Sequence, residues 1–462
     1  MARLTLAEIA RLTEGQLLQG SPSALAEHFS FDSRTIERGG FFFALSGTRD
    51  GHEFVAEVAS KGAVGACVAR EIKGLPESFG LIKVADTLKA LQKLASRILE
   101  NHKLKVIGIT GSTGKTTTKE FTAALLATRY RVLKTVGNFN NQIGLPYSIL
   151  AAEDFHQVAV LEMGMSRPGE IRELTQIAPP DLAIITGIAP VHLEFFKNLE
   201  EIALAKKEIL DGAREGATAV LNGDDPLLKK IAADYKKGEI IYFGLNPSCQ
   251  VRAENIRHLG LEGIAFNLIY GPEKAPIKVS FLHEGLVYNL LAACAACLAM
   301  QLKLEEIVPV ITQLSPAEHR GQIIRLKNEI TLFDDSYNSN PVALKKTLES
   351  LSRLKARRKI AVLGDMLELG PAEIEFHLEA GKQVALTGWD YLVTVGERAK
   401  HLASGAVANG FNRANISSFL TAEEAAQWLK DFILPGDFIL IKASHGLALD
   451  KIVKLLRQEL EE

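Results

Sequence analysis

The sequence offers little support for disulfides, membrane spans or export. Its 462 residues contain four cysteines, at positions 67, 249, 294 and 297, which is too few for a disulfide framework in a chain of this size. No apolar run approaches the ~20 residues that a membrane-spanning helix needs. The N-terminal segment MARLTLAEIARLTEG also lacks the apolar core of a signal peptide. These absences predict a cytoplasmic protein with no membrane insertion.

An excess of charge of one sign is also missing. The 53 basic and 55 acidic residues give a formal net charge of -2, so no overall positive field favours nucleic acid or an anionic membrane. The contents of 47% hydrophobic and 23% charged residues are those of ordinary globular proteins. Because the chain is longer than one hydrophobic core usually serves, we expect two or three domains.

Two of the cysteines form a Cys-x-x-Cys pair, Cys294 and Cys297, within NLLAACAACLAM. Small and apolar residues surround both thiols, and no second pair stands at zinc-ribbon spacing. This context favours packing inside a buried helix over redox or metal chemistry.

Apolar runs that alternate with helical patterns predict an α/β fold in three units. Runs without polar alternation indicate strands buried on both faces of a mostly parallel sheet. We place the domain boundaries at residues 1–101, 102–316 and 317–462. The expected strands are 41–45, 62–69 and 80–86 in the first unit, 104–109, 157–164, 181–188 and 217–225 in the second, and 330–335, 359–365, 391–397 and 437–444 in the third.

The segment TGSTGKTTT, residues 110–118, follows an apolar run and leads into a helical pattern. Gly111 and Gly114 allow backbone N–H groups to close on phosphate oxygens, and the helix N-terminus adds partial positive charge. Lys115 can reach the terminal phosphates, and Thr116 can offer a hydroxyl to Mg²⁺. The first glycine of the strict G-x-x-x-x-G-K-[ST] spacing is one position early. The strand and the helix expected on either side of the loop nevertheless favour a nucleotide site over a chance glycine turn.

Two further residues follow strands of the same unit. Glu162 ends the apolar run 158–161, where nucleotide-binding sheets often place the acid that binds Mg²⁺. His192 follows the run 181–188. A lone strand-end glutamate is more often solvated, and a lone histidine is more often structural. Because both share a sheet with the phosphate loop, they are candidates for metal or nucleotide contacts.

Lys206 lies in the helical pattern EEIALAKKEIL, between Ile202 and Leu210 on one face. Burial on that face disfavours the charged amine, and a neutral amine is a nucleophile. The alternative is a lysine that lays its stem along the core edge and keeps its ammonium in water.

A series of motifs in a fixed order resembles the Mur ligase family over essentially the whole chain. They are FDSR (31–34), SGTRDGHEF (46–54), TGSTGKTTTKE (110–120), GNFNNQIGLP (137–146), LEMGMSRPGEI (161–171), AKKEI (205–209), DDSYNSNP (334–341) and LGDMLELG (363–370). The fourth, seventh and eighth look like the branch that adds D-alanyl-D-alanine to UDP-N-acetylmuramoyl-tripeptide.

This resemblance implies a monomeric, ATP-dependent amide ligase with small-molecule substrates. The N-terminal domain would bind the UDP end of the substrate, the central domain would be a P-loop ATPase, and a C-terminal Rossmann-like domain would close over the nucleotide. A substrate carboxylate would become an acyl phosphate, which the amine of D-Ala-D-Ala attacks.

The resemblance also assigns individual residues. Lys115, Glu162, His192 and Lys206 would be catalytic, and two Mg²⁺ ions would be bound by Thr116, Glu162, His192 and a carbamylated Lys206. The expected ATP contacts are Thr110, Gly111, Ser112, Thr113, Gly114, Lys115, Thr116, Thr117, Asn289, Arg320 and Asp335. The expected substrate contacts are Ser33, Arg34, Gly47, Asp50, His52, Asn138, Asn140, Asn141, Tyr337 and Asn340.

Two motifs depart from the family pattern. Gly285 and Leu286 stand where the family usually has a His-Asn pair before Asn289, which affects the adenine contact. His445 in KASH replaces an arginine, and an imidazole cannot offer the bidentate fork of a guanidinium.

Two other functions compete with this assignment. One is a sister amide ligase that adds the third peptide residue, or a folyl-polyglutamate synthetase; DDSYNSNP and LGDMLELG argue against both. The other is a regulatory ATPase that forms no bond, which has no obvious need for the FDSR and DGH motifs.

Overall fold

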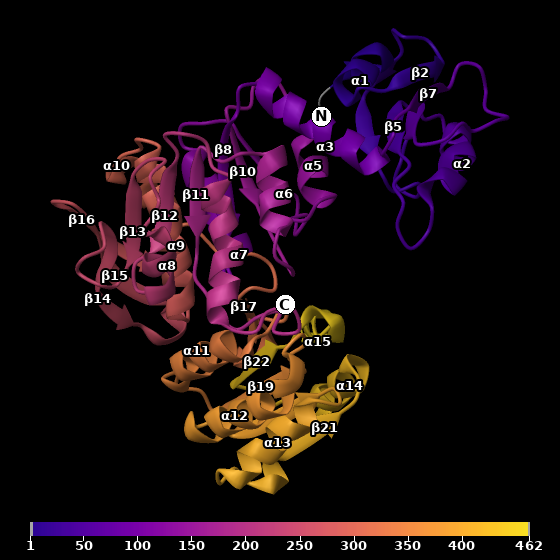
Figure 1. The fold of residues 1–462 in the computed structure, drawn as a ribbon. Helices are drawn as coiled ribbons and strands as arrows, with labels where there is room; N and C mark the ends of the chain where they lie inside the picture. Colours follow the sequence, from indigo (N-terminus) through magenta and orange to yellow (C-terminus); the bar gives the residue numbers. More distant parts are fainter. Residues whose placement is uncertain (1–2, 461–462) are drawn as a thin grey trace.

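The computed structural model describes residues 3–460, and it contains three large sheets in separate α/β units (Figure 1). The first unit, in indigo, and the third, in orange to yellow, lie on different sides of the central unit. The expectation of an α/β fold in three units is confirmed. No helix among residues 3–460 is both long and apolar enough to cross a membrane.

The first unit has a five-stranded sheet in the order β2-β7-β6-β5-β4. β2 pairs antiparallel at one edge, and the other pairings are parallel. Aromatic rings of β4 and β5 fill its core, with Phe41 and Phe43 5.6 Å apart. The elements are α1 (Leu6–Thr13), β2 (Gln16–Gln19), β4 (His28–Ser30), β5 (Gly40–Phe43), α2 (Val55–Ser60), β6 (Gly65–Val68), β7 (Gly80–Lys83) and α3 (Thr87–Asn101).

The central sheet is built around β8 (Lys105–Thr110), with β10 (Val158–Glu162) and β11 (Leu182–Ile185) parallel on either side. The register pairs Glu162 with Ile109 and Ile185 with Thr110. The carboxyl ends of the three strands therefore meet at one edge, where open α/β sheets bind ligands. The sheet continues through β9 (Val132–Lys134), β12 (Thr218–Asn222) and β13 (Ile240–Gly244), and α4 (Lys115–Leu126), α5 (Gly144–Ile149), α6 (Glu170–Ile177), α7 (Leu199–Asp211) and α8 (Pro226–Ala232) belong to the same unit.

An antiparallel extension completes this sheet, and the sequence did not predict it. It consists of β14 (Val251–His258), β15 (Ile264–Tyr270) and β16 (Glu273–Val279). β14 and β16 are only partly buried, so long apolar runs are absent there, whereas β15, IAFNLIY, is mostly buried and largely apolar. α9 (Glu284–Ala299) and α10 (Leu304–Ile311) follow. Cys294 and Cys297 are fully buried free thiols in α9, as the packing interpretation predicts.

The third unit is doubly wound around the order β17-β18-β22-β19-β20-β21. β17 pairs antiparallel with β18, and the other pairings are parallel. Its elements are β17 (Gln322–Arg325), β18 (Thr331–Asp334), α11 (Pro341–Ser352), β19 (Arg358–Gly364), α12 (Glu373–Leu386), β20 (Tyr391–Val395), α13 (Ala399–Ala408), β21 (Ile416–Phe419), α14 (Ala422–Phe432), β22 (Asp437–Lys442) and α15 (Asp450–Leu460).

Candidate active site between the central and third units

The turn from β8 to α4 can only be made with glycine at two positions. Gly114 precedes α4 with φ of 80°, and a Cβ there would lie 2.2 Å from Oδ1 of Asn289 on α9. A Cβ on Gly111 would lie 1.8 Å from Oγ1 of Thr186. Since Gly114 supplies no side-chain cap, the first N–H groups of α4 are available to an anion.

Two cations flank this loop. Nζ of Lys115 donates to the Gly111 carbonyl at 2.9 Å, and Arg320, from the chain just before β17, donates to Oγ1 of Thr116 at 3.2 Å. Burial lowers the pKa of Lys115, while the nearby Glu162 carboxylate acts in the opposite direction. The loop is therefore positively charged where phosphates would bind.

Glu162 is 1% exposed at the end of β10. Its N–H donates to Oγ1 of Thr135 at 2.9 Å, and its Oε1 accepts from Nδ2 of Asn140 at 2.8 Å. Its Oε2 is buried and has no hydrogen-bond partner within residues 3–460. A carboxylate oxygen without a partner, in a cavity that Thr116 also lines, belongs to a donor set that suits Mg²⁺.

No group of three or more His, Cys, Asp or Glu side chains in the described part of the chain could hold a metal ion. Mg²⁺ usually keeps waters and takes substrate phosphates as ligands beside one or two carboxylates. Glu162 and Thr116 therefore fit a cation whose other ligands come from the nucleotide and water.

His192 contacts the third unit. Its Nδ1 lies 2.5 Å from Oε2 of Glu368, in the loop after β19, and the N–H of Leu193 donates to the Glu368 carbonyl at 3.0 Å. The close contact with His192 lowers the pKa of Glu368. Both His192 and Glu368 have a positive φ, 55° and 61°.

Lys206 is 1% exposed on α7. Burial lowers its pKa well below the usual value, and the Lys115 charge adds to this effect. Across residues 3–460 it forms no hydrogen bond or ion pair. This burial agrees with the apolar-face interpretation rather than with a solvated ammonium, and carbamylation stays a prediction.

A cavity of about 970 Å³ joins most of the predicted residues of the central and third units. Thr110, Gly111 and Lys206 do not line it. The predicted residues that do are Ser112, Thr113, Gly114, Lys115, Thr116, Thr117, Asn138, Asn140, Asn141, Glu162, His192, Asn289, Arg320, Asp335, Tyr337 and Asn340.

The two departures from the family pattern also lie at this cavity. His445 stacks on the ring of Tyr337, with centroids 5.1 Å apart, and the guanidinium of Arg320 lies 3.7 Å from the same ring centroid. Gly285 and Leu286 line the cavity beside Asn289, and the Leu286 side chain is buried. His445 itself is exposed and lines the cavity.

The predicted substrate residues of the first unit, namely Ser33, Arg34, Gly47, Asp50 and His52, do not line this cavity. Nε2 of His52 accepts from the Ala69 N–H at 2.8 Å, so its Nδ1 carries the proton and donates to Asp50 at 2.6 Å. Hydrogen bonds from His52 lower the pKa of Asp50 to about 2. His52 thus has both ring nitrogens engaged within the first unit.

The FDSR motif is nonetheless linked to the central unit. The ring of Phe31 contacts Tyr147 at a centroid distance of 5.0 Å and Phe139 at 6.4 Å. Phe139 lies among the three asparagines of the 137–146 motif, so this aromatic cluster connects the first unit to the cavity.

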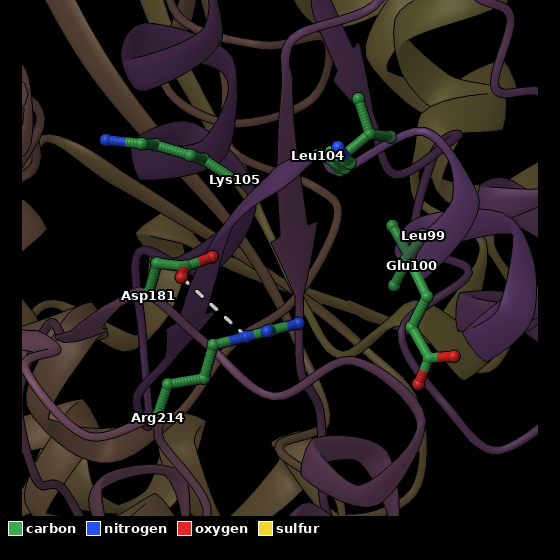
Figure 2. Close-up of a pocket in the computed structure, with 7 residues that line it drawn as sticks. Leu99, Glu100, Leu104, Lys105, Asp181 and Arg214 are labelled. Carbon is green, nitrogen blue, oxygen red and sulfur yellow. Dashed lines mark ion pairs between the residues drawn. The ribbon is translucent and has the colours of Figure 1, made fainter.

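A second cavity, of about 280 Å³, lies near the amino end of β8 (Figure 2). Arg214 and Asp181 face one another there at 3.7 Å. None of the predicted site residues lines it, and it is at the edge of the sheet opposite the phosphate loop.

Sequence reasoning missed Lys119, which is 0% exposed one turn after Lys115. It also missed Thr135 and Thr186, whose hydroxyls contact Glu162 and the phosphate loop. Their partners are mainly backbone groups, which a residue pattern does not reveal.

Comparison with known proteins agrees with this geometry. Residues 109–297 match the Mur ligase middle domain, and residues 319–445 match the family described as Mur ligase, glutamate ligase domain. The chain is 35% identical, over 98% of both chains, to the UDP-N-acetylmuramoyl-tripeptide–D-alanyl-D-alanine ligase of Bacillus subtilis. It is 32% identical to the protein of that name from Synechocystis, over 99% of this chain and 98% of the relative.

Solved structures agree as well. A crystal structure of MurF from Acinetobacter baumannii superposes with a TM-score of 0.90 at 31% identity, covering 99% of each chain. The MurF ligase of Thermotoga maritima in complex with ADP has a TM-score of 0.82 at 29% identity, covering 94% of this chain and 98% of that one. The chain therefore belongs to the Mur ligase family.

Proposed function

We propose that this protein is an ATP-dependent ligase that adds D-alanyl-D-alanine to UDP-N-acetylmuramoyl-tripeptide. The observation that carries the proposal is the cavity in which the phosphate loop, Glu162 and the asparagines of the 137–146 motif meet residues of the third unit. The full-length relatives that bear this ligase's name support the choice of substrates.

The residues of the chain suit acyl-phosphate chemistry. A carboxylate is a poor electrophile, so its oxygen first takes the γ-phosphoryl group of ATP; the amine then attacks the activated carbonyl and phosphate leaves. The N-terminus of α4 and Lys115 would hold the phosphates, and Arg320 would balance their charge. Asn138, Asn140 and Asn141 would orient the carboxylate, which lowers the entropic part of the barrier.

Mg²⁺ is part of the proposal because the reacting oxygens are all anionic. Thr116 and Glu162 would hold one ion, and His192 with a carbamylated Lys206 would hold a second; bound Mg²⁺ supplies charge neutralisation. A carbamate forms only on a neutral amine, and the lowered pKa of Lys206 supports that state.

Each domain would have a separate binding role. The first domain, residues 1–101, would bind the UDP end through the FDSR and SGTRDGHEF segments, and residues 317–462 would close over ATP bound by residues 102–316. We also propose a monomer in the cytoplasm, where ATP and the UDP-linked precursor are available.

Other classes have weaker support. A ligase for 2,6-diaminopimelate in this family superposes with a TM-score of 0.53 at 18% identity, which supports the shared fold alone. The DDSYNSNP and LGDMLELG motifs favour the D-Ala-D-Ala branch, and Tyr337 and Asn340 of the first motif line the cavity. A regulatory ATPase would not need the aromatic connection between FDSR and the cavity.

Product analysis tests the proposal directly. The protein is incubated with ATP, Mg²⁺, D-Ala-D-Ala and UDP-MurNAc-tripeptide carrying lysine or diaminopimelate, and we expect UDP-MurNAc-pentapeptide with one ADP per bond. Omission of D-Ala-D-Ala should abolish the product. ATP hydrolysis that neither substrate changes, with no pentapeptide, would refute the ligase assignment.

A further inference from the structure

Lys119 on α4 is a fully buried lysine whose ammonium has three polar partners. Nζ donates to the carbonyls of Thr135 at 2.9 Å and Gly137 at 2.7 Å, and it lies 3.1 Å from Oε1 of Glu120. An ammonium has three protons to donate, so these contacts can satisfy all of them. A buried charge is costly unless it is paired in this way, which indicates a specific role for the contacts.

These contacts fix the chain that leaves β9. Thr135 continues the pairing with β10, since its N–H donates to the Val160 carbonyl at 3.1 Å. Gly137 turns with φ of 52°, and a Cβ there would meet no atom within 4 Å. Lys119 is therefore one of the contacts that hold this turn, beside the hydrogen bonds that the Val136 N–H donates to Oγ of Ser148 at 3.3 Å and the Phe139 N–H donates to the Val136 carbonyl at 3.0 Å.

The same segment holds Glu162 from two sides. Oγ1 of Thr135 accepts from the Glu162 N–H, and Nδ2 of Asn140 donates to Glu162 Oε1. Asn140 is itself fixed, because its carbonyl accepts from the Gly164 N–H at 2.8 Å and a Cβ on Gly164 would lie 2.7 Å from its side chain. The result is a carboxylate with Oε1 occupied and Oε2 left free.

We infer that Lys119 is a positioning residue that aims Glu162 at its cation by clamping the carbonyls of Thr135 and Gly137. The inference rests on the proposed function, in which Glu162 binds Mg²⁺. Lys119 does not line the cavity, so it acts through the clamped segment and not on the substrates.

The test replaces Lys119→Met, which keeps much of the side-chain length and removes the donors, and Lys119→Gln, which keeps one donating group. Lys134→Met is the matched control, because Lys134 pairs with the other oxygen of Glu120 but not with the clamped carbonyls. The Mg²⁺ concentration that gives half-maximal pentapeptide formation is measured for each. Calorimetry of Mg²⁺-ATP binding and hydrogen exchange over residues 135–143 are followed in parallel.

For Lys119→Met we expect an increase in the Mg²⁺ requirement of at least tenfold, faster exchange confined to residues 135–143, and an ATP KM within threefold at saturating Mg²⁺. Lys119→Gln should lie between this variant and the unchanged protein, and Lys134→Met should stay within twofold. An unchanged Mg²⁺ requirement and unchanged exchange, or failure of both Lys119 variants to fold, would overturn the positioning role. Absence of pentapeptide from the unchanged protein would instead refute the ligase assignment, and calorimetry and exchange would still report on Lys119.

Discussion

At the residue scale, two buried lysines of the central unit have opposite surroundings. Lys119 has three polar contacts, which suit a charged ammonium. Lys206 is equally buried but forms no hydrogen bond or ion pair among residues 3–460, and burial lowers its pKa well below the usual value. The first lysine can therefore serve as a fixed cation, and the second as a neutral amine open to covalent change.

Lys206→Ala should lower ligase activity by on the order of 100-fold, because loss of a metal-supporting group typically costs this much. Acetate or formate should restore part of the activity by standing in for a carbamate. Turnover is measured with and without each carboxylate. Lys207→Ala, a neighbour that pairs with Asp211 and Asp234 near the surface, is the control; wild-type activity in Lys206→Ala would exclude the carbamate role.

The lowered pKa of His283 predicts that the folded protein loses stability in mild acid. Burial lowers its pKa from 6.5 to about 4. Asp335 has a smaller effect that raises the pKa, and Lys442 has a smaller effect that lowers it. Between these values the unfolded chain binds a proton that the folded protein does not, so this stabilisation is complete above pH 6.5 and is lost as the pH falls towards 4. From pH 7 to pH 5 the loss should be about 2 kcal/mol.

Urea unfolding at pH 5 and pH 7 measures this change. His283→Asn, which cannot titrate, should show a pH dependence smaller by about that amount. Equal pH dependence in the two proteins would mean that His283 is not kept neutral by burial.

At the element scale, the turn from β8 into α4 depends on contact with α9. In Gly114→Ala the new methyl group would meet Oδ1 of Asn289 at 2.2 Å while φ stays at 80°. We expect Mg²⁺-ATP binding at least about tenfold weaker, equivalent to ~1.4 kcal/mol. Calorimetry is the measurement.

Gly216→Ala separates backbone strain from the steric clash. Gly216 has a similar φ of 81°, but a Cβ at this position would meet no atom within 4 Å. This variant should lose about 1 kcal/mol of stability and bind nucleotide normally. Equal nucleotide affinity in both variants would contradict the role of the Gly114–Asn289 contact.

The buried parallel strands were predictable because their apolar runs have no polar alternation. β10 and β22, for example, are buried along their whole length and lie within a few residues of the expected ranges. β14 and β16 were not predicted because each exposes part of its surface, and β16 contains a proline, Pro276. Partly exposed strands carry less of the apolar signal on which such predictions depend, and β16 is also an edge strand of the sheet.

The candidate site was predictable for a different reason. The spacing of the phosphate loop and the acid at a strand end place Lys115 and Glu162 at one edge of the sheet, because the carboxyl ends of parallel strands lie together. This prediction needs no knowledge of the other domains. The contacts of Lys119 and Glu368 could not be derived in this way, because they join side chains to backbone carbonyls or to another domain. Both depend on tertiary distances that local patterns do not contain.

At the scale of the whole molecule, the first unit packs broadly on the central one, whereas the central and third units are joined at the cavity by individual polar pairs. The first unit contacts the central one through α3, which packs against α5 and α6 in a shared apolar core, and through Phe31 on Tyr147. The third reaches it through Arg320 on Thr116 and through Glu368 on His192. Polar contacts such as those between the central and third units allow these two domains to move relative to one another.

The contact between Glu368 and His192 should bias the position of the third domain. Glu368→Ala removes the carboxylate but keeps the backbone bond to Leu193. Since the Glu368 side chain is 51% exposed, the pair is worth at most about 1 kcal/mol, or roughly a fivefold shift between domain arrangements. Small-angle X-ray scattering of the ligand-free protein should therefore give a larger mean radius of gyration for this variant.

Glu373→Ala is the matched control, because Glu373 pairs with Arg398 inside the third domain. It removes a partly exposed carboxylate of the same type without touching the central unit, so its scattering should match that of the unchanged protein. A saturating ATP analogue with Mg²⁺ should reduce the difference between Glu368→Ala and the unchanged protein, because a nucleotide bound by both domains supplies the missing attraction. Identical scattering in all three ligand-free proteins would mean that the contact follows domain position and does not set it.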